Sequence, residues 1–128
     1  MSIEQDAKNA KAYLPLISQS GLTLPDRDYY LNADQKSATS RDQFRAYTTR
    51  VLDLAGVSDS NGAAESIFTL EKRLAEAQWT AERSRDVTAT YNKFTSTTAT
   101  AQTPGLNWNT YLNAARSGRA YPYRLSPL

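Results

Sequence analysis

Residues 63–79 read AAESIFTLEKRLAEAQW, and this stretch decides the fold class. Its apolar side chains recur three and four positions apart, which is the period of one face of an α-helix. Most of the stretch is Ala, Leu, Glu and Lys, residues with high intrinsic helix propensity. We therefore expect a helix that ends near Trp79 and begins in the loop SDSNG, with Ser58, Asp59 or Ser60 as its N-cap.

A second helix is predicted on the N-terminal side of that loop, at about residues 35–55. Its expected buried face consists of Phe44, Tyr47, Thr48, Val51, Leu52 and Ala55. Mostly arginine, aspartate and threonine lie between these positions, and Gly56 provides a C-terminal stop. These two helices make a mainly α protein the expected class.

Two further helices are expected on the C-terminal side. Thr80 can cap a short helix through residues 81–94, although β-branched residues weaken its propensity. Residues 95–105, TSTTATAQTPG, are polar and low in complexity, which predicts a linker or a poorly formed helix. Asn107 is a suitable N-cap for a last helix, whose packed side is predicted to hold Trp108, Tyr111 and Leu112.

Both ends of the chain are predicted to be extended. Residues 6–20 contain AYLPLIS, which is either a short strand interrupted by Pro15 or an extended arm. No second run with strand alternation gives it a partner. Residues 117–128 hold two interior prolines and no apolar period, so we expect a tail there. The predicted architecture is a helical domain of about four helices at residues 1–116, preceded by an extended segment.

The composition argues for one globular domain and against several classes of function. The chain has 128 residues, of which 40% are hydrophobic and 22% charged. Its 15 basic and 13 acidic residues alternate, which argues against a nucleic-acid partner. No window is apolar for long enough to span a membrane, and the first residues lack the apolar centre of a signal peptide.

The absence of histidine and cysteine bears on the chemistry of the chain. Without cysteine there are no disulfides and no thiolate ligands. Catalytic zinc sites usually take at least one imidazole, and catalytic triads need a base that titrates near neutral pH. We therefore predict no metal ligands and no resident cofactor within this chain, and any catalysis by the chain alone must use carboxylates, Lys, Ser, Thr or Tyr.

The string PDRDYY at residues 25–30 is the first candidate site. Asp26 is expected to accept a hydrogen bond from the backbone N–H of Asp28 or Tyr29, and Arg27 is within reach of both carboxylates. A catalytic carboxylate pair needs one raised pKa, whereas an arginine between two aspartates lowers both. The pattern therefore favours a structural joint.

Polar residues further along the chain also have structural interpretations. Glu71 lies on or beside the apolar face of its helix, so it needs a partner, and Arg85 is the expected one. A buried ion pair that fixes helix packing is favoured over a catalytic carboxylate. Asn92 can bond the backbone at a helix end, and Lys93 is interpreted as a solvated flank or a phosphate contact.

Five strings occur in a characteristic order: SGLTLPDRDYYL, LEKRLAEAQWT, SRD, YNKFT and LNWNTYL. In this order they resemble the N-terminal helical domain of the neprilysin and endothelin-converting-enzyme family of zinc metallopeptidases. The resemblance covers about residues 6–112. The matching structural positions, none of them catalytic or metal-binding, are Leu24, Pro25, Arg27, Asp28, Tyr29, Tyr30, Leu70, Glu71, Arg85, Asp86, Tyr91, Asn92 and Lys93.

The resemblance implies that zinc belongs to a catalytic lobe later in the parent chain, where an H-E-x-x-H helix binds it. This chain would be a fragment of the helical cover, which packs on that lobe and restricts the entry of peptide substrates. It implies a periplasmic or extracellular location, and the uncovered interface would favour self-association. Two alternatives stay open: a free-standing helical interaction module, and a carboxylate hydrolase that uses two of Asp26, Asp28, Glu71 and Asp86.

Overall fold

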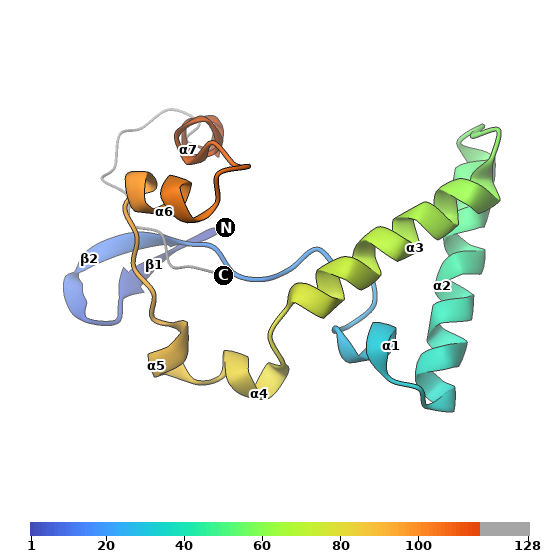
Figure 1. The fold of residues 1–128 in the computed structure, drawn as a ribbon, viewed down its shortest axis with the longest axis horizontal. Helices are drawn as coiled ribbons and strands as arrows, with labels where there is room; N and C mark the ends of the chain where they lie inside the picture. Colours follow the sequence, from blue (N-terminus) through green and yellow to red (C-terminus); the bar gives the residue numbers. More distant parts are fainter. Residues whose placement is uncertain (116–128) are drawn as a thin grey trace. The chain divides into compact units, whose positions relative to one another are not determined.

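A computed structural model describes residues 1–115 of the chain (Figure 1). Within these residues the chain forms one two-stranded sheet and seven helices. In chain order they are β1 (Ser2–Asp6), β2 (Asn9–Leu16), α1 (Asp28–Leu31), α2 (Gln35–Leu54), α3 (Ser60–Ala77), α4 (Ala81–Ser84), α5 (Val87–Thr90), α6 (Ser96–Gln102) and α7 (Trp108–Ala115). The mainly α class is confirmed. Four of the helices have seven or more residues, and the other three are single turns of four residues.

The described residues belong to two compact units. Ser20–Thr80 form the first, which we call the helical unit. The second, which we call the hairpin unit, combines Met1–Gln19 with the residues from Ala81 onward. The predicted tail at residues 117–128 and the domain end at residue 116 lie outside the described residues, so both stay predictions.

Helices α2 and α3 form the helical unit, and their ends follow from local hydrogen bonds. The Asp34 side chain caps α2 by accepting from the backbone N–H of Ser37 at 2.9 Å. Asp59 caps α3 in the same way, accepting from the N–H of Gly62 at 3.0 Å. Between the helices, Gly56 takes φ +78°, a left-handed conformation that suits the end of a helix. The predicted bounds of both helices and the predicted stop are therefore confirmed.

The core of the helical unit lies where α1, α2 and α3 meet (Figure 1). Its buried residues are Tyr30, Phe44, Phe68 and Ala75. The rings of Tyr30 and Phe68 stack with centroids 5.9 Å apart, and the Phe44 ring lies 6.4 Å from Tyr30 in an edge-on arrangement. Half-buried side chains that close this core include Leu22, Leu24, Tyr29, Leu31 and Ile67.

The predicted buried face of α2 is wrong in part. Phe44 and Thr48 are buried, but Tyr47, Val51 and Ala55 are exposed. The buried and the exposed residues all have helical spacing. Periodicity alone cannot tell how much of a helical face the neighbouring elements cover. The buried positions of α2 are Ser37, Phe44 and Thr48, which form a narrower stripe than the predicted face.

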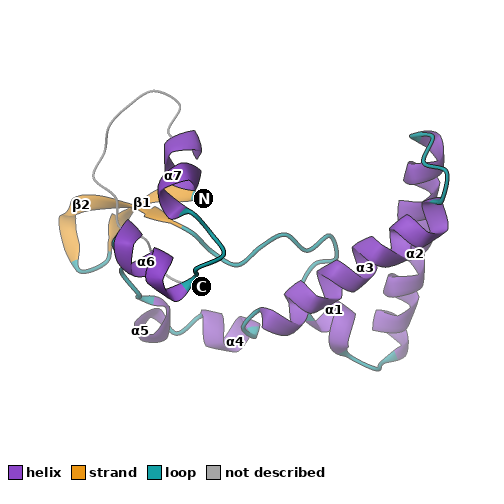
Figure 2. Ribbon diagram, turned by 45° about the horizontal axis from the view of Figure 1, so that its top comes forward, coloured by secondary structure: helices purple, strands orange, loops and turns teal. Residues whose placement is uncertain are grey.

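The N-terminal segment is a β-hairpin, which corrects the expectation of an extended segment without a partner (Figure 2). Strands β1 and β2 are antiparallel, with Ile3 opposite Pro15 and Gln5 opposite Tyr13. The sequence of β1, SIEQD, has a single apolar residue, so it lacks the alternation of apolar and polar residues that predicts a strand. Pro15 fits because each strand of a two-stranded sheet has a free edge on which a missing N–H costs nothing.

Residues 81–94 also differ from the prediction of a single helix. They form the two turns α4 and α5, separated at Arg85 and Asp86. The Asp86 carboxylate accepts from the backbone N–H groups of Thr88 and Ala89, at 2.8 and 3.0 Å, so it starts α5 as an N-cap. A residue that caps a new helix cannot also lie in the middle of an older one, which explains the break.

Helices α6 and α7 form the second small core, within the hairpin unit. Thr95 and Thr98 make a reciprocal capping box, which gives the threonine-rich segment a real helix rather than a linker. Asn107 caps α7 as predicted, accepting from the N–H of Thr110 at 2.9 Å. Ala99, Trp108 and Leu112 are buried together, with Ile17 and Phe94 packed against them. Tyr111, predicted on the packed side, contacts the Trp108 ring edge-on with centroids 5.9 Å apart, although 41% of its surface is exposed.

Candidate functional site

The joint at residues 25–30 is held by hydrogen bonds between near neighbours in the sequence and by one hydrogen bond from Arg27 to a distant residue of α3. Asp26 accepts from the backbone N–H of Asp28 at 2.8 Å, as predicted. The Arg27 guanidinium lies 3.4 Å from the Asp28 carboxylate, and its Nε donates to the backbone carbonyl of Ala75 at 3.2 Å. Pro25 is exposed ahead of this turn. Arg27 thus fastens the joint to the last part of α3.

Glu71 is the centre of a second group of bonds in the helical unit. It accepts from the backbone N–H of Thr23 at 3.0 Å, from the Thr23 hydroxyl at 2.8 Å and from the Tyr30 hydroxyl. Burial, followed by the hydrogen bond to Glu71, raises the pKa of Tyr30 to about 12. The expected partner Arg85 belongs to the hairpin unit, and the donors that hold Glu71 are these uncharged groups.

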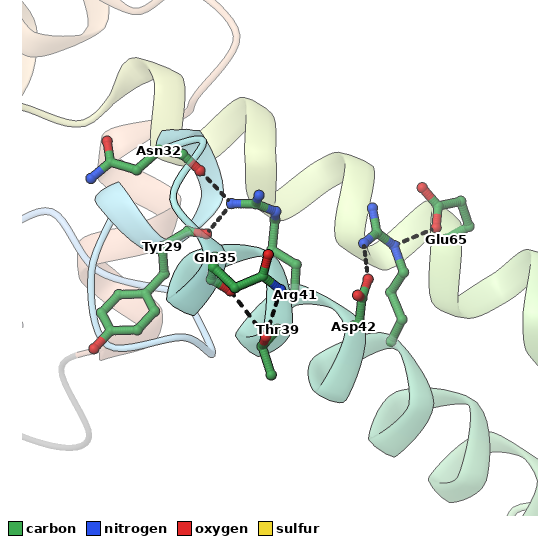
Figure 3. Close-up of polar contacts among 8 residues, drawn as sticks. Tyr29, Asn32, Gln35, Thr39, Arg41, Asp42 and Glu65 are labelled. Carbon is green, nitrogen blue, oxygen red and sulfur yellow. Dashed lines mark hydrogen bonds and ion pairs between the residues drawn. The ribbon is translucent and has the colours of Figure 1, made fainter.

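Two arginines of α2 fix the elements around it (Figure 3). Arg41 donates to the backbone carbonyls of Tyr29 and Asn32, each at 2.8 Å, so it closes the C-terminal end of α1. Arg45 pairs with Glu65 of α3 at 2.8 Å and with Asp42 at 3.7 Å. Its guanidinium also lies 3.7 Å from the centre of the Phe68 ring.

The hairpin unit contains a buried carboxylate that the sequence did not reveal. Asp6 is 3% exposed and pairs with the ammonium of Lys93, while it also accepts from the Tyr91 hydroxyl at 2.8 Å. The backbone N–H of Lys8 donates to it at 3.0 Å, and the Lys8 ammonium lies 4.2 Å from the centre of the Tyr91 ring. The hydrogen bond from Lys93, then that from Lys8, lowers the pKa of Asp6 to about 2.

The burial of Asp6 depends on the register of the hairpin, which the sequence pattern did not indicate. The pairing shifts between Gln5 and Asp6, so that Asp6 faces Asn9. Such irregularities re-aim a side chain, and here the carboxylate turns toward Tyr91 and Lys93. Lys93 is therefore neither a solvated flank nor a phosphate contact. Asn92 donates to the backbone carbonyl of Ala89 at 2.6 Å, which confirms its predicted role at a helix end.

The thirteen positions that match the family strings, which we call the structural-motif residues, fall into two groups. Those in the helical unit are Leu24, Pro25, Arg27, Asp28, Tyr29, Tyr30, Leu70 and Glu71, and those in the hairpin unit are Arg85, Asp86, Tyr91, Asn92 and Lys93. Most of the polar ones hydrogen-bond to backbone groups or to other side chains of their own unit. Their chemistry is that of joints between elements.

The four carboxylates of the hydrolase alternative are each committed to neighbouring groups. Asp26 and Asp86 accept from backbone N–H groups, Asp28 pairs with Arg27, and Glu71 is held by Thr23 and Tyr30. A hydrolytic pair needs two carboxylates that face a cleft, one with a raised pKa. The bonding of these four does not fit that requirement, so we set this alternative aside.

The donor set does not fit a catalytic zinc ion either. The sequence has no histidine and no cysteine, and residues 1–115 bring together no group of three or more acidic side chains that could hold a metal. Carboxylates alone make a poor catalytic zinc site.

Among residues 1–115, no helix is apolar enough over the length that a membrane crossing requires.

Comparison with known proteins places the chain in a class. A family model for the N-terminal part of peptidase family M13 matches residues 1–125. Human endothelin-converting enzyme-like 1 is 33% identical over 115 residues, which is 88% of this chain and 15% of that protein. Neprilysin-3 of Drosophila melanogaster is 31% identical over 116 residues, 89% of this chain and 15% of that protein.

A solved structure agrees with the sequence matches. The zinc metalloprotease ZMP1 of Mycobacterium tuberculosis, crystallised with an inhibitor, superimposes with a TM-score of 0.85 at 28% identity. The match covers 97% of this chain and 19% of that chain. The fold and sequence therefore define the N-terminal part of a neprilysin-like metallopeptidase.

The chain belongs to peptidase family M13, which confirms the resemblance read from its five strings. It spans about 15% of the length of the curated relatives that it matches.

Proposed function

We propose that this chain is part of the helical cover of a neprilysin-like zinc metalloendopeptidase. The cover packs on the catalytic lobe and restricts the access of peptides, while the lobe holds the zinc. The observation that carries this proposal is the M13 match over residues 1–125 in a chain without imidazole or thiolate. By itself the chain does not hydrolyse peptides.

The polar joints support this role because they stiffen the unit without reacting. Arg27 ties the entry segment to α3, Glu71 holds Thr23 and Tyr30, and Asp6 ties the hairpin to Lys93. We assign the structural-motif residues to the architecture of the cover. Parents of this kind would act in the periplasm or outside the cell, where peptide substrates reach them.

Two measurements test the proposal. The purified chain, supplied with zinc, is expected to leave a fluorogenic peptide intact. A chimera in which residues 1–115 replace the matching fifth of the mycobacterial metalloprotease is expected to hydrolyse that peptide, to lose the activity with chelator, and to spare an unfolded protein substrate. Chelator-sensitive hydrolysis by the chain alone, or a chimera that degrades the large substrate as readily as the peptide, would contradict the proposal.

The alternative is a free-standing helical module that binds a partner protein. The exposed apolar residues of α2 and α3 favour it, because such surfaces mark interaction sites. This module would be a well-behaved monomer that binds a protein ligand saturably. The cover instead predicts a chain with an uncovered interface.

A further inference from the structure

The flanks of α2 and α3 differ in character. Successive helical positions turn by roughly 100° about the axis, so side chains on either side of the buried stripe point to opposite flanks. On α2 one flank carries Tyr47, Val51 and Leu54, which expose 66%, 44% and 73% of their surface. The other flank carries Arg45 and Thr49.

The same division holds on α3. Leu70 and Leu74, 56% and 41% exposed, lie on one side of its buried residues Phe68 and Ala75. Glu65 lies on the other side. Each helix of the pair therefore has one buried stripe, one polar flank and one exposed apolar flank.

The ion pair between the helices shows which flanks share a side. Arg45 and Glu65 meet at 2.8 Å, and Thr49 and Asn61 meet at 3.4 Å, so both polar flanks lie on one side of the helix pair (Figure 3). In an antiparallel pair the opposite flanks must then lie together on the other side. We call this second surface the apolar face; it consists of Tyr47, Val51, Leu54, Leu70 and Leu74.

Resting on the cover role proposed above, we propose that the apolar face is the surface through which the helical unit docks on the rest of the M13 polypeptide. Isolated exposed apolar residues are ordinary, but five of them distributed along the same side of one helix pair favour an interaction surface. The relatives supply the occupant: about 85% of their length lies outside the match, since the chain covers 15% of them. An apolar surface of that remaining chain, such as one side of a helix, is complementary to this face.

The experiment is radical footprinting of Tyr47 and Leu54 in two proteins. In the 128-residue chain, at a concentration low enough for it to sediment as a monomer, both side chains should be modified readily. In the chimera with the mycobacterial metalloprotease, most of that modification should be lost. The control variant is Ala46→Lys, at an exposed position of α2 off the apolar face, and it should leave the assembly of the chimera and its peptide hydrolysis unchanged. The double variant Tyr47→Lys, Leu54→Lys should lower the melting temperature of the chimera but not that of the free chain.

Equal modification of Tyr47 and Leu54 in the chain and in the chimera would overturn the docking proposal. If the chimera does not fold, the same footprint is taken on the intact mycobacterial enzyme at the residues aligned with 47, 51 and 54, where full accessibility would overturn it as well. An active, size-selective chimera with an unprotected apolar face defeats only the docking. A protected face in a chimera without size selection defeats only the gating role.

Discussion

At the scale of single residues, hydroxyl and backbone donors hold the half-buried carboxylate of Glu71. Three hydrogen bonds, two from Thr23 and one from Tyr30, hold its two oxygens. The joint at residues 25–30 depends on Tyr30, because its ring lies in the core while its hydroxyl donates a hydrogen bond to Glu71 and accepts one from the backbone N–H of Leu24.

Replacing Tyr30 with phenylalanine tests that dependence. Its hydroxyl donates to Glu71 and accepts from the backbone N–H of Leu24 at 3.0 Å, so the variant leaves both groups without a partner while the ring stays in place. We expect the free energy of unfolding to fall by about 1–3 kcal/mol in urea denaturation. Tyr47→Phe, at an exposed position, is the matched control and should change stability by less than about 0.5 kcal/mol. Equal effects in the two variants would show that the bonds of Tyr30 contribute nothing.

Asp6 makes the hairpin unit sensitive to acid. Its pKa is lowered from 3.8 to about 2 in the folded chain, so its contribution to stability is complete above about pH 4 and is lost as the pH falls toward 2. The protection factors of the amide hydrogens in β1 and β2, measured relative to the intrinsic exchange rate at each pH, should therefore fall over that interval. Asp6→Asn should show fast exchange already at neutral pH, and the exposed hairpin variant Glu4→Gln should not. Protection in Asp6→Asn that matches the parent would refute this assignment.

At the scale of elements, the turn between α2 and α3 depends on one backbone conformation. Gly56 has φ +78°, which an L side chain adopts with strain, although a Cβ there would meet no atom within 4 Å. Gly56→Ala is expected to cost about 1–2 kcal/mol, measured by thermal unfolding. Gly105→Ala, also in open space but without a positive φ, should be neutral or slightly stabilising. A neutral Gly56→Ala would mean that the loop rearranges freely.

The long helices could be predicted from sequence because their signals are local. Asp34, Asp59 and Gly56 mark the ends of α2 and α3 within a few residues. The hairpin could not, because β1 is almost wholly polar and its pairing with β2 joins residues that no periodicity links. The Asp6 site was hidden for the same reason: its partners Tyr91 and Lys93 lie more than 80 positions away.

At the scale of the whole molecule, the described residues divide into two units with separate interiors. Each unit has its own small aromatic core, and the polar joints are satisfied within their units. Phe44 and Tyr47 belong to the same helical pattern, yet only Phe44 is buried. The sequence pattern puts both residues on one helical face, but periodicity could not tell that α1 and α3 bury Phe44 and leave Tyr47 exposed.

The apolar face predicts how the isolated chain behaves in solution. Sedimentation velocity should show concentration-dependent self-association, because Tyr47, Leu54 and Leu70 are left in water and a second copy can cover them. The double variant Tyr47→Lys, Leu54→Lys should sediment as a monomer with an unchanged helical content. Ala46→Lys, which adds the same charge to α2 off that face, should associate like the parent chain. A parent chain that remains monomeric at every concentration and binds a helical peptide saturably would instead favour the free-standing module. In that case the apolar face would be a binding site for a separate partner protein.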